Sequence, residues 1–130
     1  IDTRVEVMMR RDAYDSDHDR FMAHWRAEDA SLRDRILLAR SALPAIKTPN
    51  TVMHDCAALC IALGSDGLRG ELTLLRAARA QAAFEAADTV TRAHLKAVAP
   101  MALSHRLRRD PLDEAGSTTR VIRAVGEVLP

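Results

Sequence analysis

The sequence predicts an all-α fold, a bundle of five to seven helices in a single domain spanning residues 1–130. Hydrophobic residues make up 48% of the chain and include many alanines, whereas aromatic residues make up only 3%. Glycine is scarce as well, with five in 130 residues. Because alanine favours helices and no alternating apolar pattern is present, packed helices are favoured over a sheet.

Residues 2–14 are predicted to form a short amphipathic helix, and an acidic turn follows it. In residues 14–19 three aspartates alternate as in the first half of a calcium-binding loop, but arginine occupies the later positions that require glycine and glutamate. We therefore predict that Ser16 and Asp19 form a capping arrangement, which opens a helix running through Trp25.

The next two helices are bounded by proline and glycine. A helix over residues 30–43 is predicted by apolar residues at helical spacing, and Pro44 ends it. After a turn at residues 47–50, a helix over residues 51–63 stops at Gly64, which fits the left-handed residue that commonly follows a helix. In the helix over residues 30–43, the apolar residues at helical spacing are Leu32, Ile36, Ala39 and Leu43.

Two cysteines lie four residues apart on the helix over residues 51–63, so their side chains share one face. Three further apolar residues extend that face into a stripe, which favours buried free thiols. Zinc binding would need two more ligands, and His54 points away from this face. A disulfide between helical positions four residues apart is geometrically awkward. The stripe consists of Val52, Cys56, Leu59, Cys60 and Leu63.

A long helix over residues 68–87 is predicted after Gly67. We expect its inward face to consist of Leu68, Leu72, Leu75 and Ala82. A second face carries Arg69, Thr73, Arg76 and Ala80. For Arg76 and Arg79 the alternative to a functional role is ion pairing along the helix surface. Glu71 and Glu85 are likewise expected to pair with neighbouring arginines.

Two more helices complete the predicted bundle. Residues 89–91 supply a turn and a cap for a helix over residues 92–107, whose interior Pro100 removes one backbone hydrogen bond and should bend the helix. After a loop, Ser117 is expected to cap a last helix. The apolar residues of that helix are Val121, Val125 and Val128.

The turn before the long helix is the strongest candidate for function. It places Arg69 in the first helical turn, between Gly67 and Gly70. A helix start attracts anions, because its first amides lack partners and the macrodipole is positive there. A guanidinium adds a planar fork of donors that suits terminal phosphates, and small neighbours let a ligand approach the backbone. From these residues alone, an arginine that caps a carbonyl or lies in solvent is the alternative.

Two longer runs of sequence resemble one protein family. They are Ala-Leu-Gly-Ser-Asp-Gly-Leu-Arg-Gly-Glu-Leu within residues 55–80, and Leu-Ser-His-Arg-Leu-Arg-Arg-Asp-Pro-Leu-Asp-Glu-Ala-Gly-Ser at residues 103–117. Both closely resemble the carboxy-terminal region of the ATPase subunit of magnesium chelatase (subunit I), an AAA+ protein of chlorophyll and bacteriochlorophyll synthesis. The likeness extends over nearly the whole chain and implies the helical lid of an AAA+ protein.

The same resemblance implies a role for individual residues. It identifies Arg69 as the sensor-2 arginine, which reads the γ-phosphate of ATP bound with Mg²⁺. Gly67, Leu68 and Arg76 are further candidate contacts for the nucleotide. The resemblance does not fix whether Arg69 serves the nucleotide of its own subunit or of its neighbour, although the AAA+ branch with displaced lids favours the neighbour.

The resemblance also implies an activity for the complete protein. It would be an ATP-dependent ligase that forms nitrogen–metal bonds, inserting Mg²⁺ into protoporphyrin IX with two larger chelatase subunits, and its copies would assemble into a ring. However, residues 1–130 contain no Gly-x-x-x-x-Gly-Lys-Ser/Thr loop and no Walker B strand. We therefore expect no ATP hydrolysis by this chain alone, and residues 1–28 are the candidate linker from an ATPase core.

Other candidates for chemistry are weaker. His105, Arg106, Arg108 and Arg109 form the densest basic cluster, which is typical of a solvated helix end. A phosphate or nucleic-acid contact is one alternative, and a subunit interface is the one that the resemblance suggests. The other histidines, interpreted as surface or cap residues, are His18, His24, His54 and His94.

Charge and hydropathy limit the function classes. Nineteen basic residues against eighteen acidic ones give a net charge of +1, so no global charge draws the chain to nucleic acid or membranes. No apolar run approaches the ~20 residues of a membrane span, and the cytoplasm is the expected location. The alternative function is a stand-alone helical module that binds a protein or nucleic acid without ATP.

Overall fold

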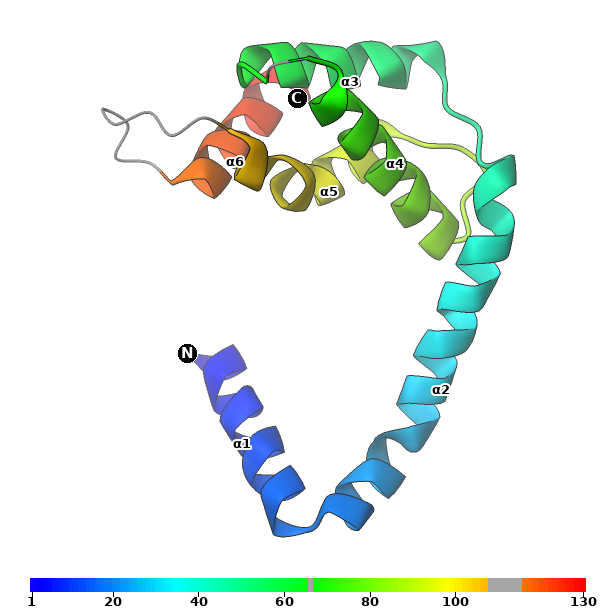
Figure 1. The fold of residues 1–130 in the computed structure, drawn as a ribbon, viewed down its shortest axis with the longest axis vertical. Coiled ribbons are helices and arrows are strands. Elements are labelled where there is room, and N and C mark those ends of the chain that lie inside the picture. Colours follow the sequence, from blue (N-terminus) through cyan, green and yellow to red (C-terminus); the bar gives the residue numbers. More distant parts are fainter. Residues whose placement is uncertain (66, 108–115) are drawn as a thin grey trace. The chain divides into compact units, whose positions relative to one another are not determined.

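The computed structural model describes residues 1–65, 67–107 and 116–130, which divide into two compact units, Ile1–Leu37 and Leu38–Pro130. The helices are α1 (Asp2–Ser16), α2 (His18–Ala42), η1 (Leu43–Ala45), α3 (Asn50–Ala62), α4 (Arg69–Phe84), α5 (Arg92–Leu103), η2 (Ser104–Arg106) and α6 (Ser117–Val128) (Figure 1). Six α-helices and no sheet strand in the described residues confirm the predicted all-α class.

The unit Ile1–Leu37 consists of α1 and the greater part of α2. Its two helices contact each other through aromatic side chains: the ring centroids of Tyr14 and Phe21 lie 5.6 Å apart, and the guanidinium carbon of Arg10 lies 4.3 Å from the ring centroid of Trp25. None of residues 1–37, all of which the structure describes, is buried.

The junction of α1 and α2 differs from the prediction in two ways. The cap is Asp17, whose Oδ1 accepts the amide of Arg20 at 3.0 Å, rather than Ser16, because α1 continues through Ser16. Beyond the cap, the two helices predicted over residues 16–25 and 30–43 form one continuous helix of 25 residues. Residues 26–29 contain neither proline nor glycine, so nothing interrupts the helix there.

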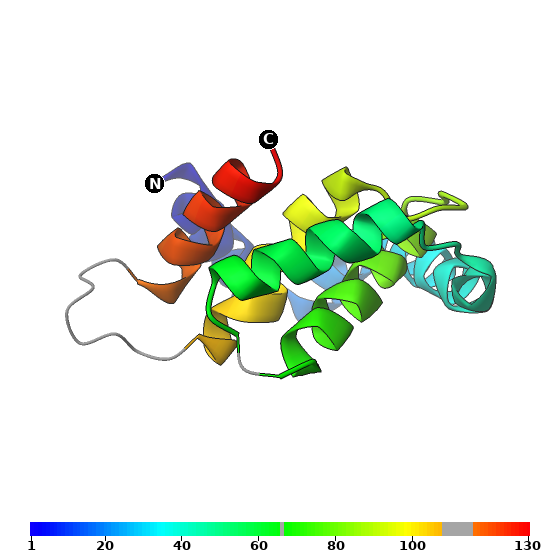
Figure 2. The ribbon, with the colours of Figure 1, turned by 90° about the horizontal axis from the view of Figure 1, so that it is seen from above.

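The unit Leu38–Pro130 contains the hydrophobic core. The α4 and α5 helices pack along each other, and α3 lies across α4 and α6 (Figures 1 and 2). The largest side chains that are almost fully buried are Leu59, Leu74, Leu95, Leu103, Leu129, Val90 and Val121. The described residues of this unit therefore form a helical bundle around one apolar cluster.

The inward face of α4 differs from the predicted one. Leu68 and Leu72 were expected in the core but are 73% and 50% exposed, whereas Leu75 is partly buried. The buried residues of α4 are Gly70, Leu74, Ala78, Ala82 and Ala83. Ala82 thus confirms the prediction in part. Most of the buried positions are small, which allows the close approach of neighbouring helices, and the larger leucines at the start of α4 lie on its exposed side.

The segment after α2 is joined to the loop that follows α4. Ile46 is buried at 7% exposure. The amide of Lys47 donates to the carbonyl of Asp88 at 2.9 Å, and the amide of Val90 donates to the carbonyl of Lys47 at 2.9 Å. These two bonds fix residues 46–47 beside the α4–α5 loop.

The last two helices begin or end earlier than predicted. α5 ends at Leu103, continues as η2, and contains Pro100, whose carbonyl accepts a hydrogen bond from the hydroxyl of Ser104 at 2.5 Å. α6 begins at Ser117, so the residue expected to cap the helix is its first residue. The cap position belongs to Gly116, which offers no side-chain acceptor.

Candidate functional site

The turn between α3 and α4 is built from two glycines in the left-handed region. The φ angle of Gly64 is 65° and that of Gly67 is 67°. The amide of Ser65 donates to the carbonyl of Cys60, and the amide of Gly64 donates to that of Ile61, which is the Schellman pattern of helix ends. The predicted stop at Gly64 is confirmed. Asp66 lies outside the described residues.

Gly70 has a packing role that differs from the predicted one. It was expected to leave space for a ligand, but a β-carbon added there would lie 2.4 Å from Oγ and 3.3 Å from Cβ of Ser65, and 3.5 Å from Sγ of Cys60. The missing side chain at residue 70 therefore lets the start of α4 approach the end of α3.

Arg69 lies in the first turn of α4, as predicted, where it is the first residue of the helix, and it is exposed. Among the residues that the structure describes, no hydrogen bond or ion pair involves its guanidinium. Leu68 occupies the cap position and gives no side-chain hydrogen bond to the first amides, and its own side chain is 73% exposed. Within the described chain, α4 thus begins with an exposed arginine and no side-chain cap, as an anion site requires.

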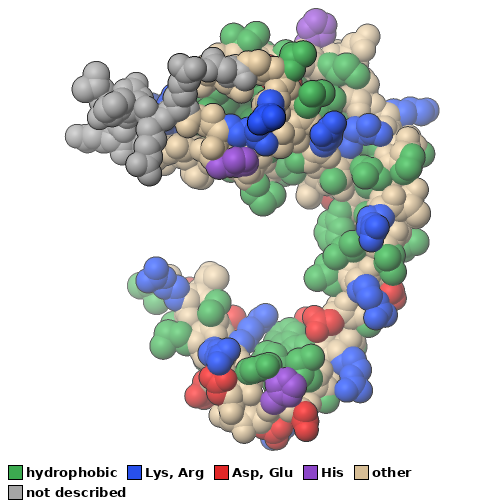
Figure 3. All heavy atoms as spheres, viewed as in Figure 1, with side chains coloured by type: hydrophobic (Ala, Val, Ile, Leu, Met, Phe, Trp, Pro, Cys, Tyr) green, Lys and Arg blue, Asp and Glu red, His purple; other side chains and the backbone are tan. Residues whose placement is uncertain are grey.

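Arg76 continues the exposed face of Arg69 two turns along α4. It too is exposed, and the ion pairs considered for it from the sequence are absent among the described residues. Figure 3 shows Lys and Arg side chains spread over the visible face of residues 38–130. Between the two arginines, the hydroxyl of Thr73 donates to the carbonyl of Arg69 at 2.8 Å, so its polar group is used within the helix.

The two glutamates expected to pair with arginines do not do so within the described residues. Glu71 has a buried Oε2 without a hydrogen-bond partner there. Glu85 instead contacts His94, whose Nε2 lies 3.1 Å from its Oε2, and Nε2 of Gln81 donates to its other oxygen at 2.5 Å. The hydrogen bond from Gln81, together with His94, lowers the pKa of Glu85.

His94 is a cap residue, as the sequence predicted. Its Nδ1 accepts the amide of Thr91 at 3.0 Å, which leaves Nε2–H to donate to Glu85. The side chain of Thr91 completes the capping box at the start of α5. This arrangement explains why a histidine that is only 6% exposed lies among apolar neighbours.

Arg79 interacts with backbone rather than with a carboxylate. Its Nη2 donates to the carbonyl of Leu43 at 3.1 Å, which ties α4 to η1. The ion pair expected for Arg79 is therefore replaced by a charge-assisted hydrogen bond to the end of α2.

One ion pair was not predicted. Arg92 and Asp55 join the start of α5 to α3 through two hydrogen bonds of 2.8 and 3.0 Å, and Asp55 raises the pKa of Arg92. The partners are 37 residues apart, so no local spacing in the sequence could indicate the pair.

Cys56 and Cys60 are free, buried thiols, as predicted. A hydrogen bond between them lowers the pKa of Cys56, and the same bond together with burial raises the pKa of Cys60 far above its usual range. The thiol of Cys56 also donates to the carbonyl of Glu71 at 3.5 Å. The pair packs α3 against the start of α4.

The basic cluster is described only in part. His105 is exposed and Arg106 is partly buried, with a buried Nε that has no partner in the described residues. Arg108 and Arg109 lie outside the described residues.

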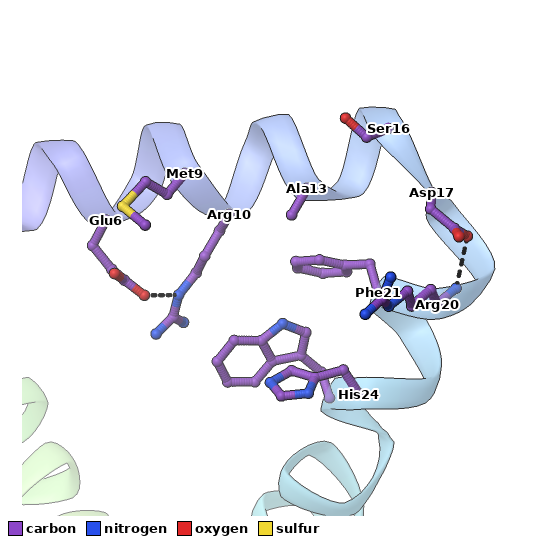
Figure 4. A pocket seen from close by; sticks show the side chains of 10 residues that line it. Glu6, Met9, Arg10, Ala13, Ser16, Asp17, Arg20, Phe21 and His24 are labelled. Atoms are coloured by element: carbon purple, nitrogen blue, oxygen red, sulfur yellow. Dashed lines mark hydrogen bonds and ion pairs between the residues drawn. The ribbon is translucent and has the colours of Figure 1, made fainter.

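A hollow of about 450 Å³ lies within the unit Ile1–Leu37, between α1 and α2. In Figure 4, Phe21 lies beneath Ala13, and Arg10 is held by Glu6 through an ion pair of 2.6 Å. The described parts of the chain contain no group of three or more His, Cys, Asp or Glu side chains that could hold a metal ion, so the hollow offers no such group either. No helix among the described residues is long and apolar enough to cross a membrane.

Comparison with known proteins identifies the family. A family model described as the AAA lid domain matches residues 53–125, from α3 to α6. The chain belongs to the AAA lid domain family. The match lies entirely within the unit Leu38–Pro130, and it places Arg69 at the start of a lid helix.

Magnesium-chelatase subunits are among the relatives of this chain. Over all 130 residues it is 77% identical to the Magnesium-chelatase 38 kDa subunit of Cereibacter sphaeroides and 66% identical to that of Rhodobacter capsulatus. Over 126 residues, or 97% of the chain, it is 36% identical to the chloroplastic Magnesium-chelatase subunit ChlI of Nicotiana tabacum. The chain spans 39%, 37% and 30% of these three proteins. The predicted resemblance is confirmed.

Proposed function

We propose that this lid completes the nucleotide site of a magnesium-chelatase ATPase subunit, with Arg69 as the residue that contacts the γ-phosphate of ATP. The exposed side chain of Arg69 at the start of α4 carries the proposal. Its position suits a phosphate for two reasons: no described residue caps the first amides of α4 with its side chain, and arginine offers a forked set of donors. Similarity over the whole chain to magnesium-chelatase subunits supplies the context.

The neighbours of Arg69 have subsidiary roles in this proposal. Gly67, with φ of 67°, shapes the turn that presents Arg69, and Leu68 offers an exposed apolar surface beside the nucleotide. Arg76 adds positive charge further along the same face. The Mg²⁺ that accompanies ATP is proposed to be bound mainly by the part of the subunit outside this lid.

The complete protein is proposed to couple ATP hydrolysis to the insertion of Mg²⁺ into protoporphyrin IX. The chain covers about two fifths of its bacterial relatives, so a phosphate-binding loop is assigned to the remaining part. Copies of the complete subunit would form a ring, work with two larger chelatase subunits and operate in the cytoplasm. Arg69 would stabilise charge that develops on the γ-phosphate and signal nucleotide state to the rest of the lid.

Replacing Arg69 by alanine in the full-length subunit tests this role. The change should alter the free energy of unfolding by less than about 0.5 kcal/mol, as an exposed substitution does. It should reduce the kcat of ATP hydrolysis by about 100-fold or more, the usual effect of removing one donor to a developing charge.

Two further variants sharpen the result. Arg69→Lys keeps the charge but not the forked donors, so it should recover only a small part of the activity. Arg123→Ala removes another exposed arginine, on α6, and should leave the rate unchanged. An unaltered ATPase rate in the Arg69→Ala variant would refute the assignment.

A further inference from the structure

Arg79 differs from the other arginines of α4. It is partly buried, whereas Arg69 and Arg76 are exposed. Its Nη2 donates to the carbonyl of Leu43 at 3.1 Å, and its Nε is buried without a hydrogen-bond partner in the described residues. A partly buried guanidinium loses hydration, and no carboxylate compensates Arg79 for that loss among the described residues. The hydrogen bond to Leu43 is therefore its main polar contact within the described chain.

The partner of Arg79 is the end of α2. Leu43 directly follows the last residue of that helix, Ala42, and begins η1. The carbonyl of Leu43 accepts the amide of Ile46 at 3.4 Å and also the guanidinium of Arg79. Carbonyls at a helix end carry the negative end of the macrodipole, so the cationic Arg79 serves as a side-chain cap after the end of α2.

The same end of α2 is held at a second place. Ile46 is buried, and Lys47 exchanges backbone hydrogen bonds with Asp88 and Val90, both at 2.9 Å. Asp88 and Val90 belong to the loop that follows α4. The C-terminal half of α4 and its following loop therefore fix residues 43–47 by a side-chain bond and two backbone bonds.

The N-terminal end of α4 packs against α3 through Gly70 but presents the side chain of Arg69 exposed. Arg69 lies ten residues before Arg79 on one continuous helix, which separates their backbones by about 15 Å along the axis. Because the spacing is ten residues, the two side chains also leave the helix on different sides. One end of α4 therefore presents an exposed arginine, and the other end is hydrogen-bonded to the residue that follows α2. A single continuous helix thus connects two distinct sites.

We infer that Arg79 is a positioning residue that couples the start of α4 to the end of α2. When Arg69 engages phosphate, α4 is held in place, and the bond from Arg79 to Leu43 passes that constraint to residues 38–47. Coupling of this kind is reciprocal, so the state of α2 also affects the affinity at Arg69. This inference rests on the proposed function of Arg69.

Hydrogen exchange of the full-length subunit, with and without a non-hydrolysable MgATP analogue, tests the inference. In the unmodified protein the analogue should slow amide exchange at least about threefold both in peptides covering residues 67–72 and in those covering residues 38–47. In Arg79→Gln the slowing should persist at residues 67–72 and disappear at residues 38–47. A purely structural role would speed exchange at residues 38–47 equally in both states, without removing the response to nucleotide.

Three variants complete the design. Arg79→Lys retains a charged donor for the single carbonyl acceptor and should restore the response at residues 38–47. Arg123→Gln is the matched control and should behave as the unmodified protein. If Arg79→Gln does not fold, Arg79→Met, which keeps an aliphatic stem but no donor, replaces it.

The outcomes separate the two proposals. Slowing at residues 67–72 without any response at residues 38–47 in the unmodified protein would overturn the inference and leave the role of Arg69 standing. An undiminished response at residues 38–47 in Arg79→Gln would do the same. No response at residues 67–72 in the unmodified protein would overturn the proposed function and this inference with it.

Discussion

Two helix ends of the lid adopt the same backbone motif with different residues, which allows a paired prediction. The left-handed residue that follows the end of α3 is Gly64, with φ of 65°, and the one that follows the end of α4 is Ala86, with φ of 56°. After α4 the amide of Ala87 donates to the carbonyl of Ala82, and that of Ala86 to Ala83, the same pattern as after α3. Alanine in the left-handed region is strained, whereas glycine is not.

The magnitude follows from two opposing terms. The left-handed conformation costs an L-residue such as alanine roughly 1–2 kcal/mol of conformational energy in the folded chain. Glycine, compared with alanine, costs about 0.4–1 kcal/mol of stability because its unfolded state has more conformational entropy. Ala86→Gly should therefore stabilise the fold by about 0.5–1 kcal/mol, and Gly64→Ala should destabilise it by a similar amount. A β-carbon at Gly64 would meet no atom within 4 Å, so the effect is one of backbone alone.

Urea unfolding of the chain, followed by circular dichroism, measures both changes. Gly126→Ala is the matched control, because Gly126 lies within α6, has no positive φ and has open space for a β-carbon. There the same substitution should stabilise by about 0.5–1 kcal/mol. If Gly64→Ala and Gly126→Ala shifted stability in the same direction, the reasoning from φ would be wrong.

Two further predictions follow from titratable groups. Cys56 and Cys60, at 2% and 0% exposure, should resist alkylation in the folded chain and both react in denaturant; rapid modification of either thiol in the native state would contradict the packing. The pKa of Glu85 is lowered in the folded chain, mainly by the hydrogen bond from Gln81 and also by His94. Its contribution to stability is therefore present above the pKa that Glu85 has in the unfolded chain, and it is lost as the pH falls through the pKa that Glu85 has in the folded chain. Glu85→Gln should therefore flatten the loss of stability between about pH 5 and pH 3 in acid titrations, and an unchanged profile would exclude this role.

Much of this fold is predictable because its signals are local. Gly64 stops α3, Pro44 lies in the turn after α2, and the apolar stripe around Cys56 gives the buried face of α3. The position of Arg69 in the first turn of α4 is of the same kind, since a glycine-containing turn precedes it. In each case the residues that decide the structure lie within a few positions of one another.

The predictions that were wrong concern features that tertiary packing determines. Leu68 and Leu72 are the larger apolar residues at the start of α4, but Leu74 and Ala78 form its buried face, because the phase of a helix is set by its neighbours. From the sequence, Arg79 was considered for an ion pair along the helix. Its actual partner, the carbonyl of Leu43, could not be predicted, because only the fold brings it close to Arg79. The roles of Gly67, Leu68, Arg69 and Arg76 toward nucleotide, and the assignment of residues 1–130 to a single domain, remain predictions.

A structure of the full-length subunit with Mg²⁺ and a non-hydrolysable ATP analogue tests the central claim most directly. We expect the guanidinium of Arg69 at hydrogen-bond distance, about 3 Å, from an oxygen of the γ-phosphate, in its own or a neighbouring subunit. A nucleotide-filled assembly in which Arg69 contacts no phosphate would contradict the claim.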